Sequence, residues 1–150
     1  MPRLKLYLDN CCFNRPFDDQ SQLLVRLETE AKLYIQEGIK NGTFEIVWSC
    51  ILDDENDADP FPQQKKRVKS WKLFAVQDIE ISDDVMRWAR HFGSKRLKSM
   101  DALHLACAKI AGVDAFITTD HGILNKRLVD IRVLNSLDFI QEMKEIHSDD

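Results

Sequence analysis

The segment SMDALHLACAKIAGVDAFITTD occupies residues 99–120 of this chain. Ser99 is suited to cap a helix over Met100–Ala111, and Gly112 is suited to end it. The apolar run Ala115–Thr119 follows almost at once, and it predicts a buried strand that stops at an aspartate. A helix followed closely by a buried strand is typical of a parallel sheet that carries helices on its faces.

The rest of the chain continues this alternation. Leu4–Leu8 and Phe44–Trp48 predict two more buried strands. Apolar residues at helical spacing from Ser21 onward predict a helix that ends at Gly38 or Gly42. The pattern as a whole predicts a parallel sheet with helices on both faces. The remaining expected strands lie over Ile79–Ile81 and Ile131–Leu134, and the remaining helices over Ile51–Asp59 (capped by Ser49), Gln63–Ala75, Val85–Phe92 (capped by Ser82), Gly122–Leu128 and Leu137–Ile146.

Length and charge set broad limits on the function. The 150 residues fit one domain spanning 1–150, and 44% hydrophobic with 31% charged residues is the balance of a soluble globular protein. A formal net charge of -4 argues weakly against a nucleic-acid partner. Acids gather at Asp53–Asp59 and bases at Lys65–Lys72 and Arg87–Lys98, however. This separation fits a basic groove around an acidic pocket, and it fits an ordinary solvated surface equally well.

The cysteines give no sign of a disulfide or a metal site. Cys11, Cys12, Cys50 and Cys107 form no CxxC pair and show no spacing typical of metal ligands. We therefore expect reduced, mostly buried thiols in a cytoplasmic protein. No apolar run approaches the roughly 18 residues of a membrane span, and the N-terminus lacks the apolar core of a signal peptide, so no membrane association is expected.

Acidic residues stand where parallel α/β sheets bind their ligands, at the carboxyl ends of strands. Asp9 directly follows the first strand, and Asp120 directly follows the strand of the opening segment. The acids at 53–55 lie just beyond the second strand, and Asp101 lies in the first turn of a helix. Four elements can therefore direct carboxylates to one edge of the sheet.

Clustered carboxylates repel one another, so at least one takes up a proton unless a cation neutralises the group. Such oxygen-rich clusters suit Mg²⁺ or Mn²⁺. These ions polarise a phosphodiester, lower the pKa of a water and stabilise the leaving oxygen, so no other nucleophile is required. Each acid also has an ordinary structural role open to it, in a turn (Asp9, Asp120), at a helix N-terminus (Asp101) or on a solvated helix face (53–55). The arrangement of all four favours the metal site.

Three segments resemble the signature segments of PIN-domain nucleases, in the same order and spacing over nearly the whole chain. They are Tyr7-Leu8-Asp9-Asn10, Met100-Asp101-Ala102-Leu103-His104-Leu105-Ala106 and Ile117-Thr118-Thr119-Asp120. The resemblance implies a three-layer α/β/α sandwich with a central parallel sheet, an acidic pocket that holds Mg²⁺ or Mn²⁺, and hydrolysis of single-stranded RNA. It also implies a homodimer and, for many small bacterial members, a toxin that is held inactive by an antitoxin protein.

The resemblance carries the family's metal-binding and catalytic acids over residue by residue. The motif aspartates correspond to Asp9, Asp101 and Asp120. The remaining family acid is a glutamate after the second strand, and Glu55 is the only glutamate of its predicted helix. Asp54 is the alternative to Glu55, because acids are crowded at this point of the chain.

Several neighbours of these acids are candidates for supporting roles. Asn10 and Thr118 are candidates to orient a carboxylate or a water, and Thr118 shares a strand face with Asp120. A turn role for Asn10 and an ordinary strand role for Thr118 are the alternatives.

His104 lies three residues after Asp101 on its helix, a spacing that can bind metal. We favour a packed or hydrogen-bonded structural histidine, because the family pattern contains this histidine without using it as a usual ligand.

Basic residues close to the motifs are candidates for contact with RNA phosphates. The bases at 65–72 fit a solvated helix better than an RNA site. Of the tryptophans, only Trp71, with lysines on both sides, is a candidate for stacking on a base. The candidates for phosphate contact are Arg15, Lys95, Arg96 and Lys98.

Other functions fit less well. Phosphatases with an aspartyl nucleophile need a second aspartate two residues after the first, where this chain has Cys11. Signal-receiver domains need a lysine after a late strand, where this chain has Asp120. The main alternative is a PIN fold that binds RNA or a protein without cutting, although RNA binding alone has no use for clustered negative charge.

Overall fold

The computed structural model of the protein describes residues 3–13 and 23–148. Its sheet has five parallel strands in the order β3-β2-β1-β4-β5. None of the described helices has the length and apolarity needed to cross a membrane. The strands are β1 (Leu4–Leu8), β2 (Phe44–Ser49), β3 (Ala75–Ile79), β4 (Ala115–Ile117) and β5 (Val133–Leu134). The helices are α1 (Leu23–Lys40), α2 (Cys50–Asp57), α3 (Pro62–Ser70), α4 (Asp83–Gly93), α5 (Ser99–Ala111), α6 (His121–Leu124) and α7 (Ser136–Ser148), with 3-10 turns η1 (Asn10–Phe13) and η2 (Trp71–Phe74).

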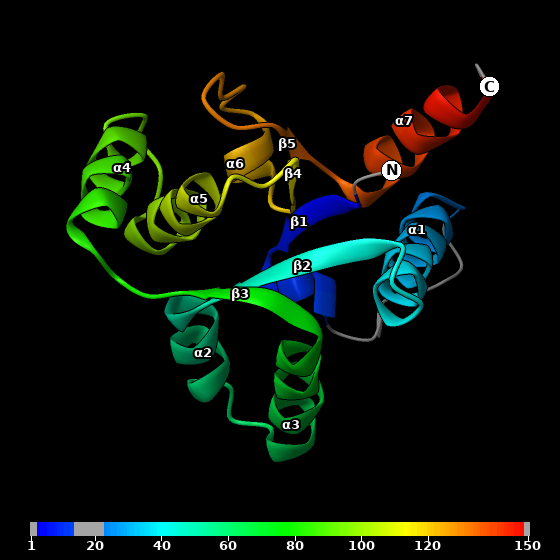
Figure 1. Ribbon diagram of the computed structural model, residues 1–150, viewed down its shortest axis with the longest axis horizontal. Coiled ribbons are helices and arrows are strands. Elements are labelled where there is room, and N and C mark those ends of the chain that lie inside the picture. Colours follow the sequence, from blue (N-terminus) through cyan, green and yellow to red (C-terminus); the bar gives the residue numbers. More distant parts are fainter. Residues whose placement is uncertain (1–2, 14–22, 149–150) are drawn as a thin grey trace.

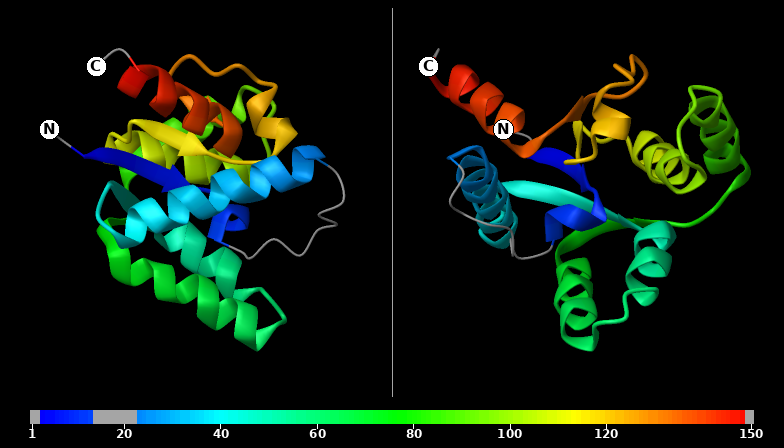
Figure 2. Two further views of the ribbon diagram at one scale, coloured as in Figure 1. Left: turned by 90° about the vertical axis from the view of Figure 1, so that its right-hand side faces the viewer. Right: turned by 180° about the vertical axis from the view of Figure 1, so that it is seen from behind.

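Helices cover both faces of the sheet, so the molecule has three layers. Figure 1 shows α1 and α7 on one side of the strands and α4 with α5 on the other. The view from behind in Figure 2 shows the same two groups, with α2 and α3 beyond the β3 edge of the sheet. Helix α1 packs against α7 and β2, and α5 packs against α4, β2 and β3. This arrangement confirms the predicted α/β sandwich with a central parallel sheet.

The largest difference from the predicted elements lies at the β3 edge. The strand predicted over Ile79–Ile81 lies instead over Ala75–Ile79, and the helix predicted over Gln63–Ala75 ends at Ser70. Three of the five β3 residues are exposed, because β3 is an edge strand. Its sequence therefore lacks the apolar run by which a buried parallel strand is recognised.

The structure confirms the helix ends predicted at Ser49, Ser82 and Gly112, but not the one at Ser99. Ser49 and Ser82 cap α2 and α4, and each side-chain oxygen accepts the backbone N–H three residues later. Gly112 ends α5 in the left-handed conformation, with φ of 70°. Ser99 is not a cap: α5 begins at Ser99 itself, with Lys98 at the cap position and no hydrogen bond from its side chain.

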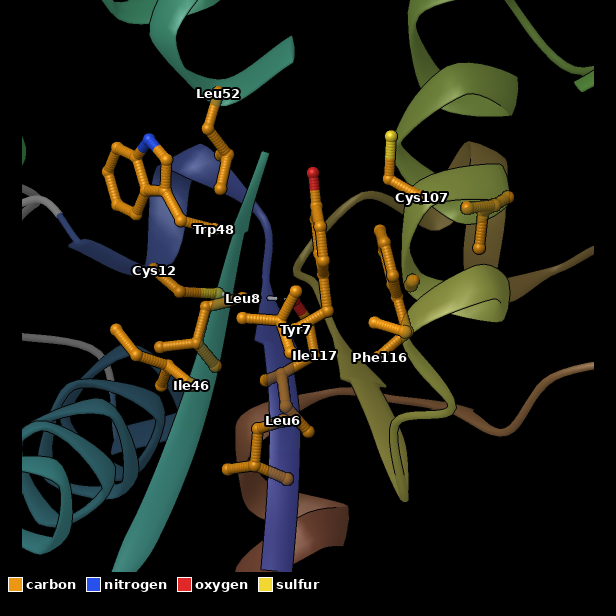
Figure 3. Packing of buried hydrophobic residues seen from close by; sticks show 14 of the residues in the cluster. Leu6, Tyr7, Leu8, Cys12, Ile46, Trp48, Leu52, Cys107, Phe116 and Ile117 are labelled. Carbon is orange, nitrogen blue, oxygen red and sulfur yellow. Dashed lines mark hydrogen bonds between the residues drawn. The ribbon is translucent and has the colours of Figure 1, made fainter. Parts of the chain in front are cut away.

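Strand β1 lies at the centre of the core. Leu6, Tyr7 and Leu8 are completely buried, and successive side chains of a strand point to opposite faces of the sheet. Figure 3 shows the Tyr7 ring parallel to the Phe116 ring beside α5, with Leu6 on the other side of the strand. The two ring centroids lie 5.2 Å apart. Burial on both faces explains why β1 is almost continuously apolar.

Gly38 lies inside α1, so the first of the two predicted helix ends is wrong. A Cβ added at Gly38 would lie 2.4 Å from the Phe44 ring. That ring is buried and packs edge-on against Phe139, with centroids 5.4 Å apart. The glycine therefore allows α1 to approach β2 closely. The helix ends at Lys40, two residues before Gly42, which has φ of 83°.

We expect Gly38→Ala to lower the free energy of unfolding by about 1–3 kcal/mol, because the buried Phe44 ring has to move away from the new methyl group. The higher helix propensity of alanine, worth about 1 kcal/mol, offsets part of this loss. Gly93→Ala is the matched control, since Gly93 ends α4 and nothing lies within 4 Å of an added Cβ. Urea denaturation measures both variants, and equal stabilities would contradict the packing argument.

Candidate active site

From β1 the chain adds β2 and β3 on one side of the sheet, and it then adds β4 and β5 on the other side of β1. The direction in which strands are added therefore reverses between β1 and β4. Ligands of open α/β sheets bind outside the carboxyl ends of the strands at such a point. Asp9 follows β1 here, and Thr118 follows β4. The backbone N–H of Asp9 donates to the Ile117 carbonyl at 2.9 Å. The Thr118 hydroxyl donates to Oδ2 of Asp9 at 2.8 Å, so these two strand ends are joined through Asp9.

The Asp9 carboxylate is half-buried and held at both oxygens. Its Oδ1 accepts the backbone N–H of Asn10 at 2.8 Å, while Oδ2 accepts the Thr118 hydroxyl. Burial raises the pKa of Asp9, and the charge of Glu55 adds to this effect, whereas the Thr118 hydrogen bond opposes it. The carboxylate is therefore well oriented and disfavoured in its charged form, which is the condition that a bound cation would relieve.

Glu55 reaches the same place from α2. This helix starts immediately after β2, and the Ser49 side chain caps it by accepting the Leu52 N–H at 3.2 Å. Oε2 of Glu55 lies 3.1 Å from Nε2 of His104 on α5. Asp9, Glu55 and His104 each offer one atom able to bind a metal ion, and these atoms all lie within 4.8 Å of one another.

The structure separates Glu55 from the neighbouring acids of α2. Oδ1 of Asp53 accepts the indole N–H of Trp48 at 2.9 Å, and Oδ2 lies 3.0 Å from the Lys72 ammonium. Asp54 is exposed. Of the three adjacent acids, Glu55 alone is grouped with Asp9, which favours it over Asp54 as the acid predicted at this point.

Asp101 and Asp120 lie outside the close group of Asp9, Glu55 and His104, and Asp101 interacts with Asp9 through its charge. Asp101 lies in the first turn of α5. Burial raises its pKa most, followed by the charges of Asp120 and Asp9. Asp120 caps α6, since its Oδ1 accepts the Gly122 N–H at 2.7 Å, and its own N–H donates to the Thr118 hydroxyl at 3.1 Å. Asp101 is therefore affected by the charges of Asp120 and Asp9, but neither Asp101 nor Asp120 belongs to the group of described atoms that lie within 4.8 Å of one another. Asp120 fills the turn role considered for it.

Thr118 and Asn10 both lie directly beside the acids. Thr118 is completely buried, and its hydroxyl bridges Asp9 and the backbone of Asp120. This bridging explains why β4 ends at Ile117 rather than at the predicted Thr119. Asn10 opens η1, and among the described residues its buried Oδ1 has no hydrogen-bond partner.

The basic candidates differ in which acid their charge acts on. Lys95, Arg96 and Lys98 are exposed in the connection between α4 and α5. The charge of Lys98 lowers the pKa of Asp101, so it acts on the acidic group. The charge of Lys95 acts instead on Asp130. The fourth candidate, Arg15, lies outside the described residues.

Trp71 is not available for stacking on a base, so that prediction is wrong. Its side chain is 7% exposed and packs against Phe13 and Phe74. The Lys40 ammonium lies over the ring, 5.3 Å from its centroid. Flanking lysines in the sequence suggested an exposed ring, but the turn of η2 directs Trp71 into the core.

His104 has more contacts than the sequence could show. It is 1% exposed, its Nε2 contacts Glu55, and its Nδ1 lies 2.6 Å from the Tyr7 hydroxyl. That hydroxyl also lies 2.7 Å from Oγ of Ser49. The predicted hydrogen-bonded histidine is confirmed, but Tyr7 and Ser49 were expected only as a strand residue and a helix cap. A tyrosine in the buried end of a strand is the signal that points to a buried polar partner, because a buried hydroxyl usually forms a hydrogen bond.

The cysteines carry no disulfide, as expected, and two of the four are half-buried. Cys11 lies beside the acidic group, with Sγ 3.2 Å from the Thr119 hydroxyl. A hydrogen bond with Cys12 lowers the pKa of Cys11 to about 7. Cys12 is buried, and its pKa is raised well above the usual value by the same contact and by burial.

No protein-family model and no curated protein sequence matches this chain. Solved structures do match. A VapBC2 complex from Rickettsia felis, bound to a DNA fragment from its promoter, superposes with a TM-score of 0.57 over 88% of this chain and 98% of the matched chain, at 13% identity. A DNA-bound VapBC complex from Salmonella typhimurium gives 0.57 over 89% and 98%, at 12% identity. VapBC complexes pair an antitoxin with a toxin that has the PIN fold.

The chain has a PIN-like fold. The identities of 12–13% are too low to say more than this about the chain. The strand order of this fold sets β4 beside β1, and Figure 3 shows Tyr7 on the same side of β1 as Cys107 of α5. Residues that are more than a hundred positions apart in the chain, such as Asp9 and Thr118, thereby come into contact.

Proposed function

We propose that this chain is a metal-dependent endoribonuclease that hydrolyses phosphodiester bonds of single-stranded RNA. The observation that carries the proposal is that Asp9 and Glu55, from separate elements, bring carboxylate oxygens within 4.8 Å of one another near the carboxyl end of β1, while the charges of Asp101 and Asp9 act on one another. Grouped acids at a half-buried site cost stability unless they have a cationic partner, so their presence supports a function that uses them.

The donor atoms present fit Mg²⁺ or Mn²⁺. Asp9 and Glu55 offer carboxylate oxygens within 4.8 Å of one another, and Asp101 adds a carboxylate whose pKa is raised by its acidic neighbours. Oxygen ligands are those that both ions prefer. When bound, such an ion lowers the pKa of a water and neutralises charge on the phosphodiester. Asp9, Glu55, Asp101 and Asp120 are the residues that we propose to hold it.

The neighbouring residues have distinct proposed tasks. Thr118 fixes one oxygen of Asp9 through its hydroxyl, and Asn10 presents a buried carbonyl oxygen beside Asp9 that has no partner among the described residues. We propose that they orient a carboxylate or a water. The exposed bases that precede α5 attract the RNA phosphates. Of these, Lys98 is the one whose charge acts on Asp101. The proposed phosphate contacts are Arg15, Lys95, Arg96 and Lys98.

We further propose that the chain is the cytoplasmic toxin of a toxin–antitoxin pair, acting as a homodimer and inhibited by an antitoxin protein. The VapBC complexes that share its fold support this. So do the exposed apolar side chains of α1 and a groove of about 520 Å³ between α1 and α7, because a protein partner covers such surfaces. Helix α1 presents Leu23, Leu24 and Tyr34 to solvent.

The test is cleavage of a single-stranded RNA by the purified full chain, after treatment with a chelator and after adding back Mg²⁺ or Mn²⁺. We expect cleavage only with the added ion, because a divalent cation lowers the pKa of a bound water and neutralises charge on the phosphodiester. A double-stranded RNA of the same sequence is the control substrate. Equal cleavage after exhaustive chelation would contradict the metal-dependent mechanism, and binding without cleavage would identify a non-catalytic RNA-binding module.

A further inference from the structure

A buried chain of hydrogen bonds links the start of α2 with Glu55 by way of β1 and α5. Ser49 Oγ accepts the Leu52 N–H at 3.2 Å and lies 2.7 Å from the Tyr7 hydroxyl. The same hydroxyl lies 2.6 Å from Nδ1 of His104, whose Nε2 lies 3.1 Å from Oε2 of Glu55. Ser49 and Tyr7 are completely buried and His104 is 1% exposed. Water therefore does not compete for the hydrogen bonds among Ser49, Tyr7 and His104, and each of these is strengthened by the low local dielectric. The side chain of Glu55, at the end of the chain of bonds, is 30% exposed.

The chemistry of these groups sets the direction of the chain. An ionised carboxylate only accepts hydrogen bonds, so Nε2 of His104 carries the proton that Glu55 accepts. The other nitrogen of a neutral imidazole is an acceptor, and the Tyr7 hydroxyl donates to it. The Tyr7 oxygen can in turn accept the Ser49 hydroxyl. Every member then has a partner for both its proton and its lone pair.

We infer that His104 is a positioning residue, which aims Glu55 at the acidic group through its Nε2–H, and is not itself a ligand of the divalent cation. The inference rests on the proposed function, because it assigns a role toward the cation of that site. Both ring nitrogens are engaged, Nδ1 by Tyr7 and Nε2 by Glu55, so no ring lone pair is free for a metal ion. The cation is then held by oxygen atoms alone.

The placement of His104 on α5 gives this helix two tasks. The helix carries Asp101 in its first turn and His104 one turn later. It therefore positions one acid through its own backbone and a second, Glu55 of α2, through the His104 ring. The ring is held edge-on to Tyr7, with centroids 5.7 Å apart and planes at 67°. Because Tyr7 is itself stacked on Phe116, the direction of the Nε2–H bond is fixed by packing in the core.

The first experiment reads the protonation of the ring directly. Histidine ring signals of the ¹⁵N-labelled full chain are recorded by NMR after removal of metal, and again with saturating MgCl₂. The His104 signals are assigned from their absence in His104→Gln. We expect a proton on Nε2 in both samples. A bare Nε2 in the metal-free protein, or loss of its proton when Mg²⁺ is added, overturns the inference.

The second experiment measures the affinity for Mn²⁺ alone, by calorimetry, in variants of the full chain. His104→Leu removes the donor to Glu55, and we expect an affinity about 10–100-fold lower, the usual effect of losing a residue that orients a metal ligand. His104→Gln can still donate an amide N–H to Glu55, and we expect it to recover most of this loss. His91→Gln is the matched control, because His91 pairs with Asp130 on the surface, and we expect wild-type affinity.

The outcomes separate this inference from the proposed function. Unchanged Mn²⁺ affinity in His104→Leu, or equal losses in the leucine and glutamine variants, contradicts the positioning role even if RNA is cleaved. A protein that binds Mn²⁺ as described but leaves RNA intact retains the positioning role and loses the proposed reaction. If His104→Leu does not fold, the ring protonation of the wild-type protein still decides the question.

Discussion

Asp101→Asn is expected to reduce the rate of RNA cleavage at least about a hundredfold while the protein remains folded. Loss of a charged metal ligand removes several kcal/mol of transition-state stabilisation, and each 1.4 kcal/mol or so is a factor of about ten in rate. Asparagine keeps the size of the side chain, and Asp101 is half-buried beside the charges of Asp120 and Asp9. Initial rates on a fixed single-stranded RNA, measured with saturating Mg²⁺, provide the comparison. Asp9→Asn is expected to have a similar effect.

Asp83→Asn is the matched control for Asp101→Asn. Asp83 also lies in the first turn of a helix, at the start of α4, but it is exposed. Both aspartates interact with the partial positive charge of a helix N-terminus, so only the grouping with other acids distinguishes them. We expect Asp83→Asn to cleave RNA at the wild-type rate. A similar loss in both variants would mean that Asp101 acts as an ordinary helix-terminal acid.

The second large effect is expected for the binding of Mg²⁺, which should stabilise the folded protein against unfolding. Mg²⁺ should raise the free energy of unfolding of the metal-free protein by about 2.7 kcal/mol when its concentration is 100 times the Kd, because it binds only the folded state. In Asp101→Asn the same concentration should give a much smaller gain. Thermal unfolding followed by circular dichroism, with and without MgCl₂, measures both. Equal stabilisation of the two proteins would show that Mg²⁺ binds elsewhere.

The stability of the metal-free protein should depend on pH in a direction that follows from the pKa shifts of its acids. Burial and neighbouring acids raise the pKa of Asp101 and of Asp9 in the folded state. A raised pKa contributes stability that is fully present below the unfolded-state pKa and is lost as the pH rises through the folded-state value. At pH 7 Asp101→Asn should therefore unfold at the same or a higher temperature than the wild type, with the difference vanishing in acid. A clearly lower melting temperature at pH 7 would identify Asp101 as a structural cap.

Sequence patterns predicted the elements best where burial is greatest. Leu4–Leu8 is buried on both faces and was predicted to the residue. The edge strand β3 was misplaced, because an exposed strand does not need the apolar run that identifies a buried one. Gly38 and Gly42 are the two predicted ends of the first helix, because glycine usually serves there, whereas the close approach of Gly38 to Phe44 depends on a strand that follows later in the chain.

The candidate site likewise has some residues that the sequence predicts and some contacts that only the structure shows. The motif segments predict Asp9, Asp101 and Asp120, because each directly follows a predicted strand or lies in the first turn of a predicted helix, and such positions are visible in a linear sequence. Sequence reasoning also predicts Glu55, with Asp54 as the alternative, and the structure favours Glu55. Only the packing of α2 shows that Asp53 is engaged by Trp48 and Lys72 while Glu55 contacts His104.

The amino-acid sequence by itself determined the parallel α/β architecture and the acidic character of the site, since hydrophobic periodicity and strand-end aspartates are local properties. Tertiary structure alone decided which polar groups meet. Tyr7, Ser49 and His104 come from three elements, and nothing in their local sequence reveals the bonds between them. Hydrogen bonds act over about 3 Å, so partners separated by 97 positions along the chain, as Tyr7 and His104 are, become partners only when the sheet and α5 have packed together.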